Sequence, residues 1–358
     1  MTHADADPTS PSSFRTRADK RGEEMIAASG RLDGDAPNSL RAFEPLFRGL
    51  RSAKAIKALE QIRRFARHSD VPILIEGETG TGKTLLARYL HAMSPRSRGP
   101  FEHVDIGTLD DTLASSELFG HIAGAFTDAR RNRAGCFVSA KDGTIFLDEI
   151  GKASLAVQQK LLHAVEYGEV RPLGADRKVR VNARVVTASN RPLSSLVEEN
   201  RFLPDLHARL EAFRVYLPPL RQRRADIPLL VQCYVASHAP GCGYGNSLPA
   251  VAPELMQALT QAPWPYNLRQ LSSTVHCLLF EAEGACELTL IHCRENLQYL
   301  RGFARRDTSL ALDDIERAIA DADHNISLAA SRLGLDRSTL YRRRARLRAH
   351  DEKGGASQ

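Results

Sequence analysis

The chain has 358 residues, of which 42% are hydrophobic and 26% are charged, which is enough for roughly two or three domains with a substantial core. It contains no run of about 18 apolar residues, and residues 1–30 lack the apolar stretch of a signal peptide, which argues against membrane insertion and export. The net charge of +6 is compatible with nucleic acid as a partner but does not require it. We therefore expect a cytoplasmic protein with no membrane partner.

The six cysteines show no CxxC spacing, which predicts free thiols in a cytoplasmic chain. Cysteine and histidine are also the ligands that structural zinc prefers. A zinc site is therefore a minor alternative, with the ligands His276, Cys277, His292 and Cys293.

The first two hundred residues or so indicate a disordered tail followed by an α/β domain. Residues 1–40 are rich in Ser, Pro, Asp, Gly and Arg without periodicity, which predicts disorder. Between residues 41 and 68 apolar residues recur every three to four positions, which predicts a helix. Four apolar segments are then typical of buried strands, namely residues 71–77, 143–150, 181–189 and 213–220. Because stretches long enough for helical crossovers separate them, residues 41–222 are expected to form a doubly wound parallel sheet.

The remainder of the chain is predicted to be helical. Residues 223–300 have helical patterning that a Pro- and Gly-rich loop at residues 238–253 interrupts. A polar linker at residues 301–308 separates this segment from two or three short helices within residues 309–350, and residues 351–358 are expected to be disordered. In the last helical segment, "ISLAASRLG" ends at Gly334 and a helix capped by Asp336 or Ser338 follows, which is the spacing of a helix-turn-helix domain.

The segment "GETGTGKT", residues 77–84, directly follows a predicted strand and precedes a predicted helix, as a P-loop requires. Its glycines let backbone N–H groups surround phosphates, Lys83 reaches the β- and γ-phosphates, and Thr84 ligates Mg²⁺. The sequence therefore predicts a site for ATP and Mg²⁺. Its expected ligands are Gly77, Glu78, Thr79, Gly80, Thr81, Gly82, Lys83, Thr84 and Asp148, with Thr84 and Asp148 on the metal.

The apolar strand in "TIFLDEI" carries Asp148 and Glu149 at its carboxyl end. Alone, two such acids are as easily explained as surface charge. Downstream of a P-loop they indicate a Walker B pair, with Asp148 near Mg²⁺ and Glu149 near the attacking water. Asn190, after another strand, is a further candidate to hold the water or the γ-phosphate, although a polar strand end can also be a simple cap.

Residues 337–348, "RSTLYRRRARLR", contain six arginines and no acid, which favours a polyanionic partner such as DNA. The alternative is a small helical packing domain with a solvated basic face. On the DNA hypothesis the residues early in the second helix meet base edges and the later ones meet phosphates. The first group is Arg337, Ser338, Thr339 and Arg342, and the second is Arg343, Arg344 and Arg346.

The stretch from about residue 47 to 277 resembles the AAA+ domain of bacterial enhancer-binding proteins, the activators of sigma-54 RNA polymerase. The matching blocks are "GETGTGKT", "ELFGHIAGAFTDA", "GTIFLDEI", "LPPLRQRRADI" and "WPYNLRQL", in that order. The C-terminal segment resembles the Fis-type helix-turn-helix domain of the same family. The resemblance implies an AAA+ P-loop NTPase with an α-helical lid, a homo-oligomeric ring that is expected to be a hexamer, and promoter-upstream DNA and sigma-54 RNA polymerase as partners.

The resemblance also assigns individual roles. Arg209 corresponds to an arginine finger that reaches a neighbouring subunit's ATP, and Arg269 corresponds to the sensor II arginine. Because no receiver module precedes residue 41, the chain is similar to short activators that a separate regulatory protein controls. The segment "GAFTDA" resembles the GAFTGA loop, which implies sigma-factor contact by Gly124, Ala125, Phe126, Thr127, Asp128 and Ala129.

Four positions depart from the pattern of the family. Asp128 replaces the last glycine of GAFTGA, Leu203 replaces the first finger arginine, Asp105 replaces an asparagine, and Tyr266 replaces the glycine of WPGN. ATP binding is compatible with all four, whereas hydrolysis and sigma-54 contact depend on them. The sequence thus leaves two hypotheses, an ATP-hydrolysing sigma-54 activator or a degenerate AAA+ regulator that binds DNA without remodelling sigma-54 polymerase.

Overall fold

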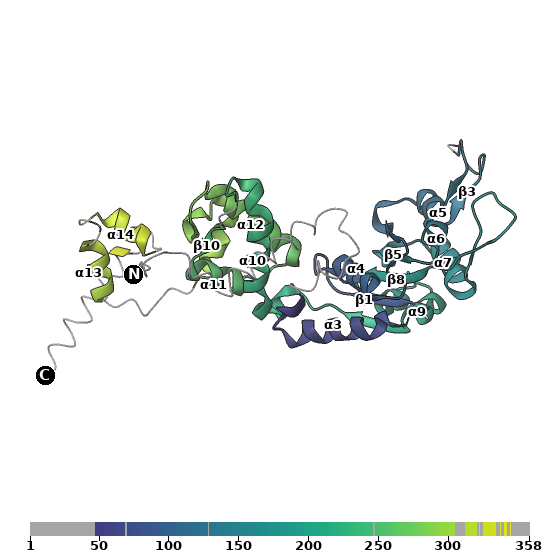
Figure 1. The fold of residues 1–358 in the computed structure, drawn as a ribbon, viewed down its shortest axis with the longest axis horizontal. Coiled ribbons are helices and arrows are strands. Elements are labelled where there is room, and N and C mark those ends of the chain that lie inside the picture. Colours follow the sequence, from purple (N-terminus) through teal and green to yellow (C-terminus); the bar gives the residue numbers. More distant parts are fainter. Residues whose placement is uncertain are drawn as a thin grey trace, which may run out of the picture. The chain divides into compact units, whose positions relative to one another are not determined.

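The structure is a computed structural model. It describes residues 47–68, 70–127, 129–245, 248–304, 312–320, 322, 325–333, 337, 340, 341 and 344. The predicted tails at residues 1–40 and 351–358 lie outside this set. The chain divides into two compact units, Met1–Ser237 with Trp264–Ser272, and His238–Pro263 with Ser273–Gln358. Figure 1 shows the elements along the chain.

The first unit is built on a five-stranded parallel sheet with the strand order β2-β5-β8-β1-β9. Each of the four predicted strand segments contains one of these strands, which agrees with the expected α/β fold. The sequence did not predict β2, because its polar residues Glu102 and His103 hide the apolar pattern. The strands are β1 Ile73–Glu76, β2 Phe101–Asp105, β5 Thr144–Asp148, β8 Arg184–Ser189 and β9 Phe213–Tyr216.

Helices cover both faces of this sheet, because alternate strand residues point to opposite sides. Leu74 of β1 packs in one hydrophobic cluster with α5 to α9, whereas Ile73 and Ile75 pack in the other with α3 and α4. The helices are α3 Ala53–Ala66, α4 Lys83–Met93, α5 Asp111–Phe119, α6 Cys136–Ser139, α7 Leu155–Tyr167, α8 Leu193–Glu198, α9 Pro204–Leu210 and α10 Ile227–His238. Short 3-10 turns include η1 Ile106–Thr108, η2 Ile150–Lys152, η3 Leu220–Gln222 and η4 Arg224–Asp226.

The first described helix is shorter than the periodicity of residues 41–68 predicted. Residues 47 and 48 are helical, but α3 begins only at Ala53. The carboxylate of Asp226 accepts hydrogen bonds from the backbone N–H groups of Arg51 and Ser52, at 2.6 and 2.8 Å. This long-range contact fixes extended backbone just before α3, and local periodicity does not reveal it.

Two small hairpins place two loops side by side. β3, Gly120–His121, pairs with β4, Arg133–Ala134, and β6, Glu169–Val170, pairs with β7, Val179–Arg180. A bridge between His121 and Leu173 then joins the hairpins. The loop at residues 122–132 is therefore held against the loop at residues 171–178.

The second unit contains α11, Pro253–Gln261, and most of α12, which spans Asn267–Glu281. The segment predicted as an uninterrupted loop, residues 238–253, includes a 3-10 turn, η5 Ala239–Cys242, and a short strand, β10 Ala250–Val251. That strand forms because the Ala250 N–H donates to the carbonyl of Cys286, next to β11 at Glu287–Leu288. The turns η6, Leu290–His292, and η7, Glu295–Gly302, follow.

The C-terminal helices α13, Leu312–Ala320, and α14, Ile326–Arg332, share a small apolar core. Asn325 caps α14, because its side chain accepts from the N–H groups of Ser327 and Leu328. Beyond α14, residues 337, 340, 341 and 344 are helical, and Leu340 is buried in the same core. The predicted helix-turn-helix domain therefore has its two leading helices and part of the following one in place.

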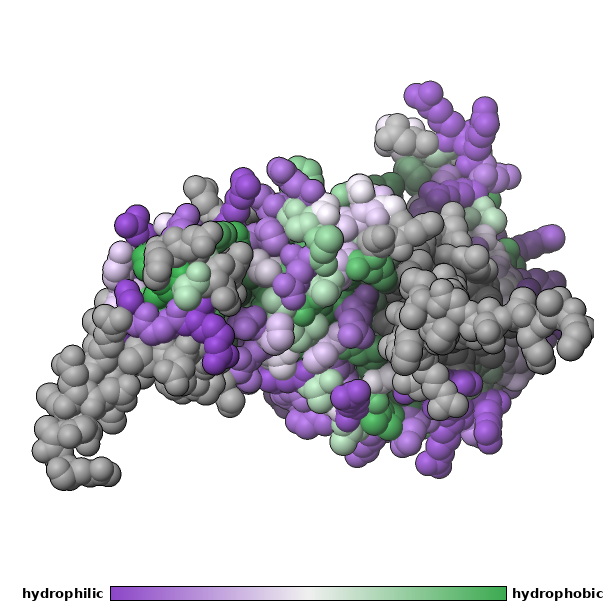
Figure 2. Space-filling view, turned by 60° about the vertical axis from the view of Figure 1, so that its left-hand side comes forward, coloured by the Kyte–Doolittle hydropathy of each residue, from purple (hydrophilic) through white to green (hydrophobic). Residues whose placement is uncertain are grey.

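The described surface is mostly polar. Figure 2 shows hydrophilic side chains over much of the visible described surface, with smaller hydrophobic areas between them. Among the helices that the structure describes, none has the length and apolar character needed to cross a bilayer.

Glu76, the last residue of β1, is a buried carboxylate that joins three elements. It is 2% exposed, and it accepts from the backbone N–H of Leu193 at 2.9 Å and from Nε of Arg214 at 2.7 Å. If this carboxylate is removed, the buried N–H of Leu193 loses its acceptor, whereas Arg214 keeps its pairing with Glu211 at 3.1 Å.

Glu76→Ala should lower the free energy of unfolding by about 1–3 kcal/mol, since it leaves the buried N–H of Leu193 without an acceptor. Urea unfolding can be followed by the fluorescence of Trp264, the single tryptophan, which is buried in the same unit. Glu60→Ala, at an exposed position of α3, is the matched control and should change stability little. Equal stability of the two variants would contradict the role of Glu76.

Candidate functional site

The loop at residues 77–84 joins β1 to α4 in the strand-loop-helix arrangement that its sequence predicted. Gly80 and Gly82 have φ angles of +77° and +100°, which favour glycine. A Cβ on Gly80 would also lie 2.4 Å from the carbonyl oxygen of Tyr266. Because α4 begins at Lys83, the unpaired N–H groups of its first turn adjoin this loop, which is a favourable setting for an anion.

A polar cavity of about 190 Å³ lies against this loop. It brings together the P-loop, the acid pair after β5 and the first turn of α12, which are far apart in the sequence. Its lining residues are Thr79, Gly80, Gly82, Lys83, Thr84, Asp148, Glu149 and Arg269. The cavity thus contains most of the residues that the sequence predicted for ATP, Mg²⁺ and catalysis.

Thr84 and Asp148 provide oxygen atoms that fit a magnesium ion. The Thr84 hydroxyl donates to Oδ2 of Asp148 at 3.2 Å. Burial alone would raise the pKa of Asp148, but the nearby imidazole of His103 and the charge of Lys83 hold it below its usual value. An ionised carboxylate beside a hydroxyl is the kind of hard oxygen pair that Mg²⁺ prefers.

Lys83 is buried at the start of α4, where its ammonium donates to the carbonyl oxygens of Gly77 at 2.9 Å and Glu78 at 3.2 Å. Burial lowers the pKa of Lys83, and the carboxylates of Asp148 and Glu149 oppose this effect. A buried cation that faces two carboxylates is typical of a binding or catalytic site and not of a hydrophobic core.

An apolar cavity adjoins the P-loop on its other side. Phe47, Leu50, Leu59 and Leu268 are among its lining residues, and its polar margin is formed by Arg223, which donates to the carbonyl oxygen of Thr81 at 2.6 Å. The sequence analysis did not identify this cavity. Its shape depends on four separate segments that only the fold brings together.

Asn267 connects the P-loop to the turn that precedes α12. It is fully buried and has a left-handed φ of +52°. Its Oδ1 accepts from the N–H of Leu220 at 2.6 Å, and its Nδ2 donates to the carbonyl oxygen of Thr79 at 3.0 Å. In the next residue, the N–H of Leu268 donates to the carbonyl of Gly80 at 2.8 Å. These contacts hold the turn against the P-loop and place Arg269 on the wall of the cavity.

Two residues that the sequence placed near the γ-phosphate are outside the lining of the polar cavity. Arg209 on α9 is 56% exposed at its side chain and pairs with Glu166 of α7 at 2.6 Å. Asn190 follows β8 and is half-buried. Thr187, in the same stretch, uses its hydroxyl to donate to the carbonyl of Ile73 within the sheet.

Two residues near the acid pair were missed by the sequence analysis. His103 lies on the unpredicted strand β2, with Nε2 3.8 Å from Oδ2 of Asp148. Lys152 forms an ion pair with Glu149. Asp105, which replaces the asparagine of the family pattern, accepts from the N–H of Gly107 at 2.9 Å and so caps the η1 turn.

The loop that contains Phe126 is partly sheltered. The Phe126 ring is half-buried and meets the ring of His121 edge-on, with 5.0 Å between centroids, whereas Thr127 is exposed. Phe126 was predicted to contact the sigma factor, and in the structure the β3–β4 hairpin brings His121 beside it. Asp128 lies outside the described residues. Sigma-factor contact by this loop stays a prediction.

The described arginines of the C-terminal domain differ in their surroundings. Arg337 is exposed, with its guanidinium 5.9 Å from the ring centre of Tyr341. Arg344 pairs with Glu316 of α13 at 2.8 Å, so its charge is balanced within the domain. Ser338, Thr339, Arg342, Arg343 and Arg346 lie outside the described residues. The proposed DNA contacts therefore stay predictions.

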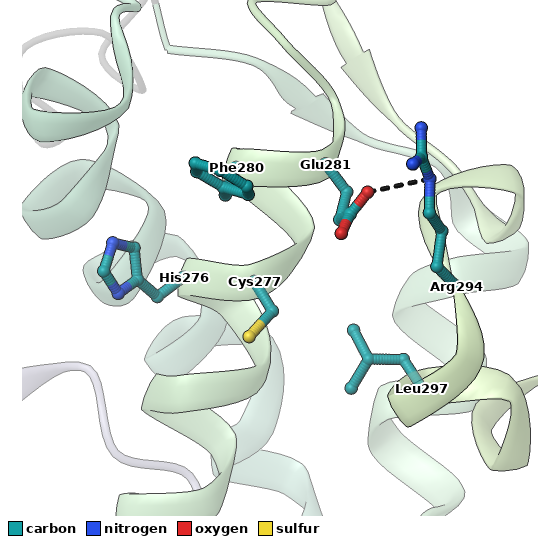
Figure 3. Close-up of a pocket in the computed structure, with 6 residues that line it drawn as sticks. All are labelled: His276, Cys277, Phe280, Glu281, Arg294 and Leu297. Atoms are coloured by element: carbon teal, nitrogen blue, oxygen red, sulfur yellow. Dashed lines mark ion pairs between the residues drawn. The ribbon is translucent and has the colours of Figure 1, made fainter.

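A cavity of about 290 Å³ in the second unit lies near the residues of the zinc alternative. Figure 3 shows Cys277, Phe280 and the Glu281–Arg294 ion pair around it. His292 uses Nδ1 to accept from the N–H of Thr289 at 3.0 Å. Within the described part of the chain, no three His, Cys, Asp or Glu side chains are grouped closely enough to hold a metal.

Asn267→Gly should lower the free energy of unfolding by about 2–4 kcal/mol, since it keeps the left-handed backbone and removes only the side-chain hydrogen bonds. Urea unfolding monitored through Trp264 measures the change. Asn200→Gly is the matched control, because Asn200 is exposed and has a similar φ of +55°. A loss of stability of the same size in both variants would show that the side chain of Asn267 is not the cause.

Three family models match the chain in order: the Sigma-54 interaction domain at residues 50–216, the AAA+ ATPase lid domain at 221–307, and the Bacterial regulatory protein, Fis family, at 314–347. Among curated proteins, the anaerobic nitric oxide reductase transcription regulator NorR of Salmonella agona is 35% identical over 343 residues. NorR of Salmonella arizonae is 35% identical over 350 residues. Each match covers 88% of this chain and 66% of the relative, so the chain spans slightly less than two thirds of these proteins.

Among solved structures, NtrX from Brucella abortus in complex with ATP is 28% identical, with a TM-score of 0.62. That match covers 83% of this chain and 68% of NtrX. The NtrX complex with ADP is 27% identical, with a TM-score of 0.61 and the same coverage. With the P-loop NTPase site on its parallel sheet and the three domain matches in sequence, the chain belongs to the family of sigma-54-dependent transcriptional regulators with an AAA+ domain, a helical lid and a Fis-type helix-turn-helix.

Proposed function

We propose that this protein is a DNA-binding transcriptional activator that hydrolyses ATP in an oligomeric AAA+ ring and thereby remodels sigma-54 RNA polymerase. The polar cavity supports this proposal most directly, because Lys83, Glu149 and Arg269 meet there in a chain with a sigma-54 interaction domain. NorR, the relative named above, is a transcription regulator, and NtrX has been solved with ATP.

The two cavities beside the P-loop would bind different parts of ATP. The polar cavity accommodates phosphates, since left-handed glycines, the start of α4 and Lys83 all present donors to it. The apolar cavity is lined largely by leucine, which suits the adenine base, but at about 40 Å³ it must widen to admit that base. Thr84 and Asp148 would hold Mg²⁺, which neutralises phosphate charge when bound.

Glu149 is the proposed general base of hydrolysis. Its carboxylate follows the Mg²⁺-binding Asp148 and lies on the wall of the polar cavity, within the Coulomb field of Lys83. A carboxylate in this place can accept a proton from the attacking water. Arg269, on the same wall, would stabilise the negative charge that develops on the γ-phosphate.

The position of Arg209 favours an oligomer. Its guanidinium is on the exposed surface of α9 and does not line the polar cavity of its own chain. In a ring it would reach the nucleotide of an adjacent subunit, so that hydrolysis requires assembly. We expect a hexamer by analogy with the family.

The loop at residues 124–129 is the proposed contact with the sigma factor. It follows α5, and α5 in turn follows the η1 turn that touches Glu149 through Gly107. A continuous stretch of chain, residues 107–126, thus leads from the neighbourhood of the proposed base to Phe126. Movement at the nucleotide site can be transmitted along it to the loop.

The decisive measurement is open-complex formation on a sigma-54 promoter by the parental protein, Glu149→Gln and Phe126→Ala. Glu149→Gln should bind ATP but lose hydrolysis and open-complex formation, by about 100-fold or more for loss of a general base. Phe126→Ala should retain hydrolysis and lose open-complex formation, because only the contact is removed.

The control for this experiment is Phe280→Ala, which removes an exposed aromatic ring of α12 in the second unit and should behave as the parent. If the parental protein and Phe126→Ala regulate the promoter equally, the remodelling proposal is wrong. The degenerate regulator that binds DNA without remodelling would then be the better description.

Removal of residues 309–358 should abolish sequence-specific DNA binding and leave ATP affinity nearly unchanged, since the six arginines of residues 337–348 lie outside the first unit. A DNA footprint and a nucleotide titration of the same truncated protein measure the two properties. Binding by the full chain should weaken steeply as salt is raised, because phosphate contacts release counterions. A footprint that survives the truncation would place the DNA interface elsewhere.

A further inference from the structure

Glu149, the proposed base, forms an ion pair with Lys152, which lies in the turn that follows it. It is followed by η2, which ends at Lys152, and the N–H of Lys152 donates to the carbonyl of Glu149 at 2.9 Å. The side chains of the two residues form an ion pair through Nζ and Oε2. Glu149 itself has a left-handed φ of +53°. The backbone turn and the ion pair together fix the direction of this carboxylate.

Gly107 provides the surface on which this ion pair lies. A Cβ at that position would be 2.5 Å from Oε2 of Glu149 and 3.1 Å from both Cδ and Nζ of Lys152. Gly107 does not have a left-handed backbone, so it is needed here for space and not for its φ angle. The carboxylate oxygen that pairs with Lys152 is therefore directed at η1, the turn after β2.

The surrounding charges favour a persistent ammonium at Lys152. The hydrogen bond that the Lys152 ammonium donates to Glu149 raises the pKa of Lys152, and the carboxylates of Asp105 and Asp148 act in the same direction. The side chain of Lys152 is 52% exposed and that of Glu149 is 22% exposed. An ion pair this accessible to water contributes little free energy, so it can be broken readily.

We propose that Lys152 is a positioning residue that holds the Glu149 carboxylate against Gly107 and away from the attacking water, so that this ion pair must open before hydrolysis. The inference rests on the proposed function, because it assumes that Glu149 is the base. Lys152 does not line the polar cavity and acts only through Glu149. Its effect should therefore be on turnover and not on ATP binding.

The test is steady-state ATPase kinetics of the full-length protein. Lys152→Ala should raise kcat by about three- to five-fold, the scale of an exposed ion pair, and should leave KM for ATP within about two-fold of the parent. Lys152→Arg should keep parental kcat because it retains the cation. Lys141→Ala, which removes an exposed lysine outside the cavity, is the matched control and should also keep parental kcat.

A second variant tests the same ion pair from the other side. Gly107→Ala should raise kcat by about the same factor, because its methyl group displaces Oε2 of Glu149. The double variant Gly107→Ala and Lys152→Ala should be no faster than either single variant, since both remove one interaction. Full additivity, a kcat for Lys152→Ala that is unchanged or lower, or an equal rise in Lys152→Arg would each overturn the proposal.

Glu149→Gln, measured in the same assay, separates this inference from the proposed function. If Glu149→Gln turns over ATP as fast as the parent, Glu149 is not the base and the proposed mechanism itself fails. If Glu149→Gln is inactive while Lys152→Ala matches the parent, the mechanism stands and only the role of Lys152 is rejected.

Discussion

The architecture of the nucleotide site depends on one buried amide, the side chain of Asn267. It satisfies the N–H of Leu220 and the carbonyl of Thr79 at once, so it ties the P-loop both to the segment after β9 and to the turn before α12. The left-handed φ of Asn267 allows that turn to approach closely enough for its next N–H to reach Gly80. These hydrogen bonds fix the position of Arg269 relative to Lys83. Arg269 can therefore form one wall of the cavity.

The parts of the site that are local in sequence could be predicted. The P-loop is a single strand-loop-helix unit whose glycines, Lys83 and Thr84 are adjacent, and the Walker B acids end an apolar strand. In both motifs the functional residues are adjacent in the sequence and belong to the same strand, loop or helix, so the motif can be identified without knowledge of the fold. The parallel sheet could be predicted in the same way, because β1, β5 and β8 are buried on both faces and their sequences are largely apolar.

The parts that depend on register or on side-chain direction could not be predicted. His103 reaches Asp148 only because β2 pairs beside β5, and no apolar pattern marks β2 as a strand. Lys152 is three residues from Glu149, but their pairing requires the left-handed turn and the open surface of Gly107. The contact of Phe126 with His121 arises from the pairing of two short strands, β3 and β4, which the sequence pattern does not indicate.

The ion pair between Arg209 and Glu166 bears on the strength with which subunits associate. Its guanidinium already has a carboxylate partner 2.6 Å away within its own chain. In the proposed ring, moving Arg209 to the phosphates of an adjacent subunit exchanges one charged partner for another. The free energy gained is the difference between the Arg209–phosphate and the Arg209–Glu166 interactions, and it is smaller than the Arg209–phosphate interaction alone. Arg209 would therefore add little to the affinity between subunits, and its main effect would be to favour interfaces that contain a nucleotide. Assembly of the proposed ring would then draw its affinity from other contacts, and Arg209 would distinguish interfaces that hold a nucleotide from those that do not.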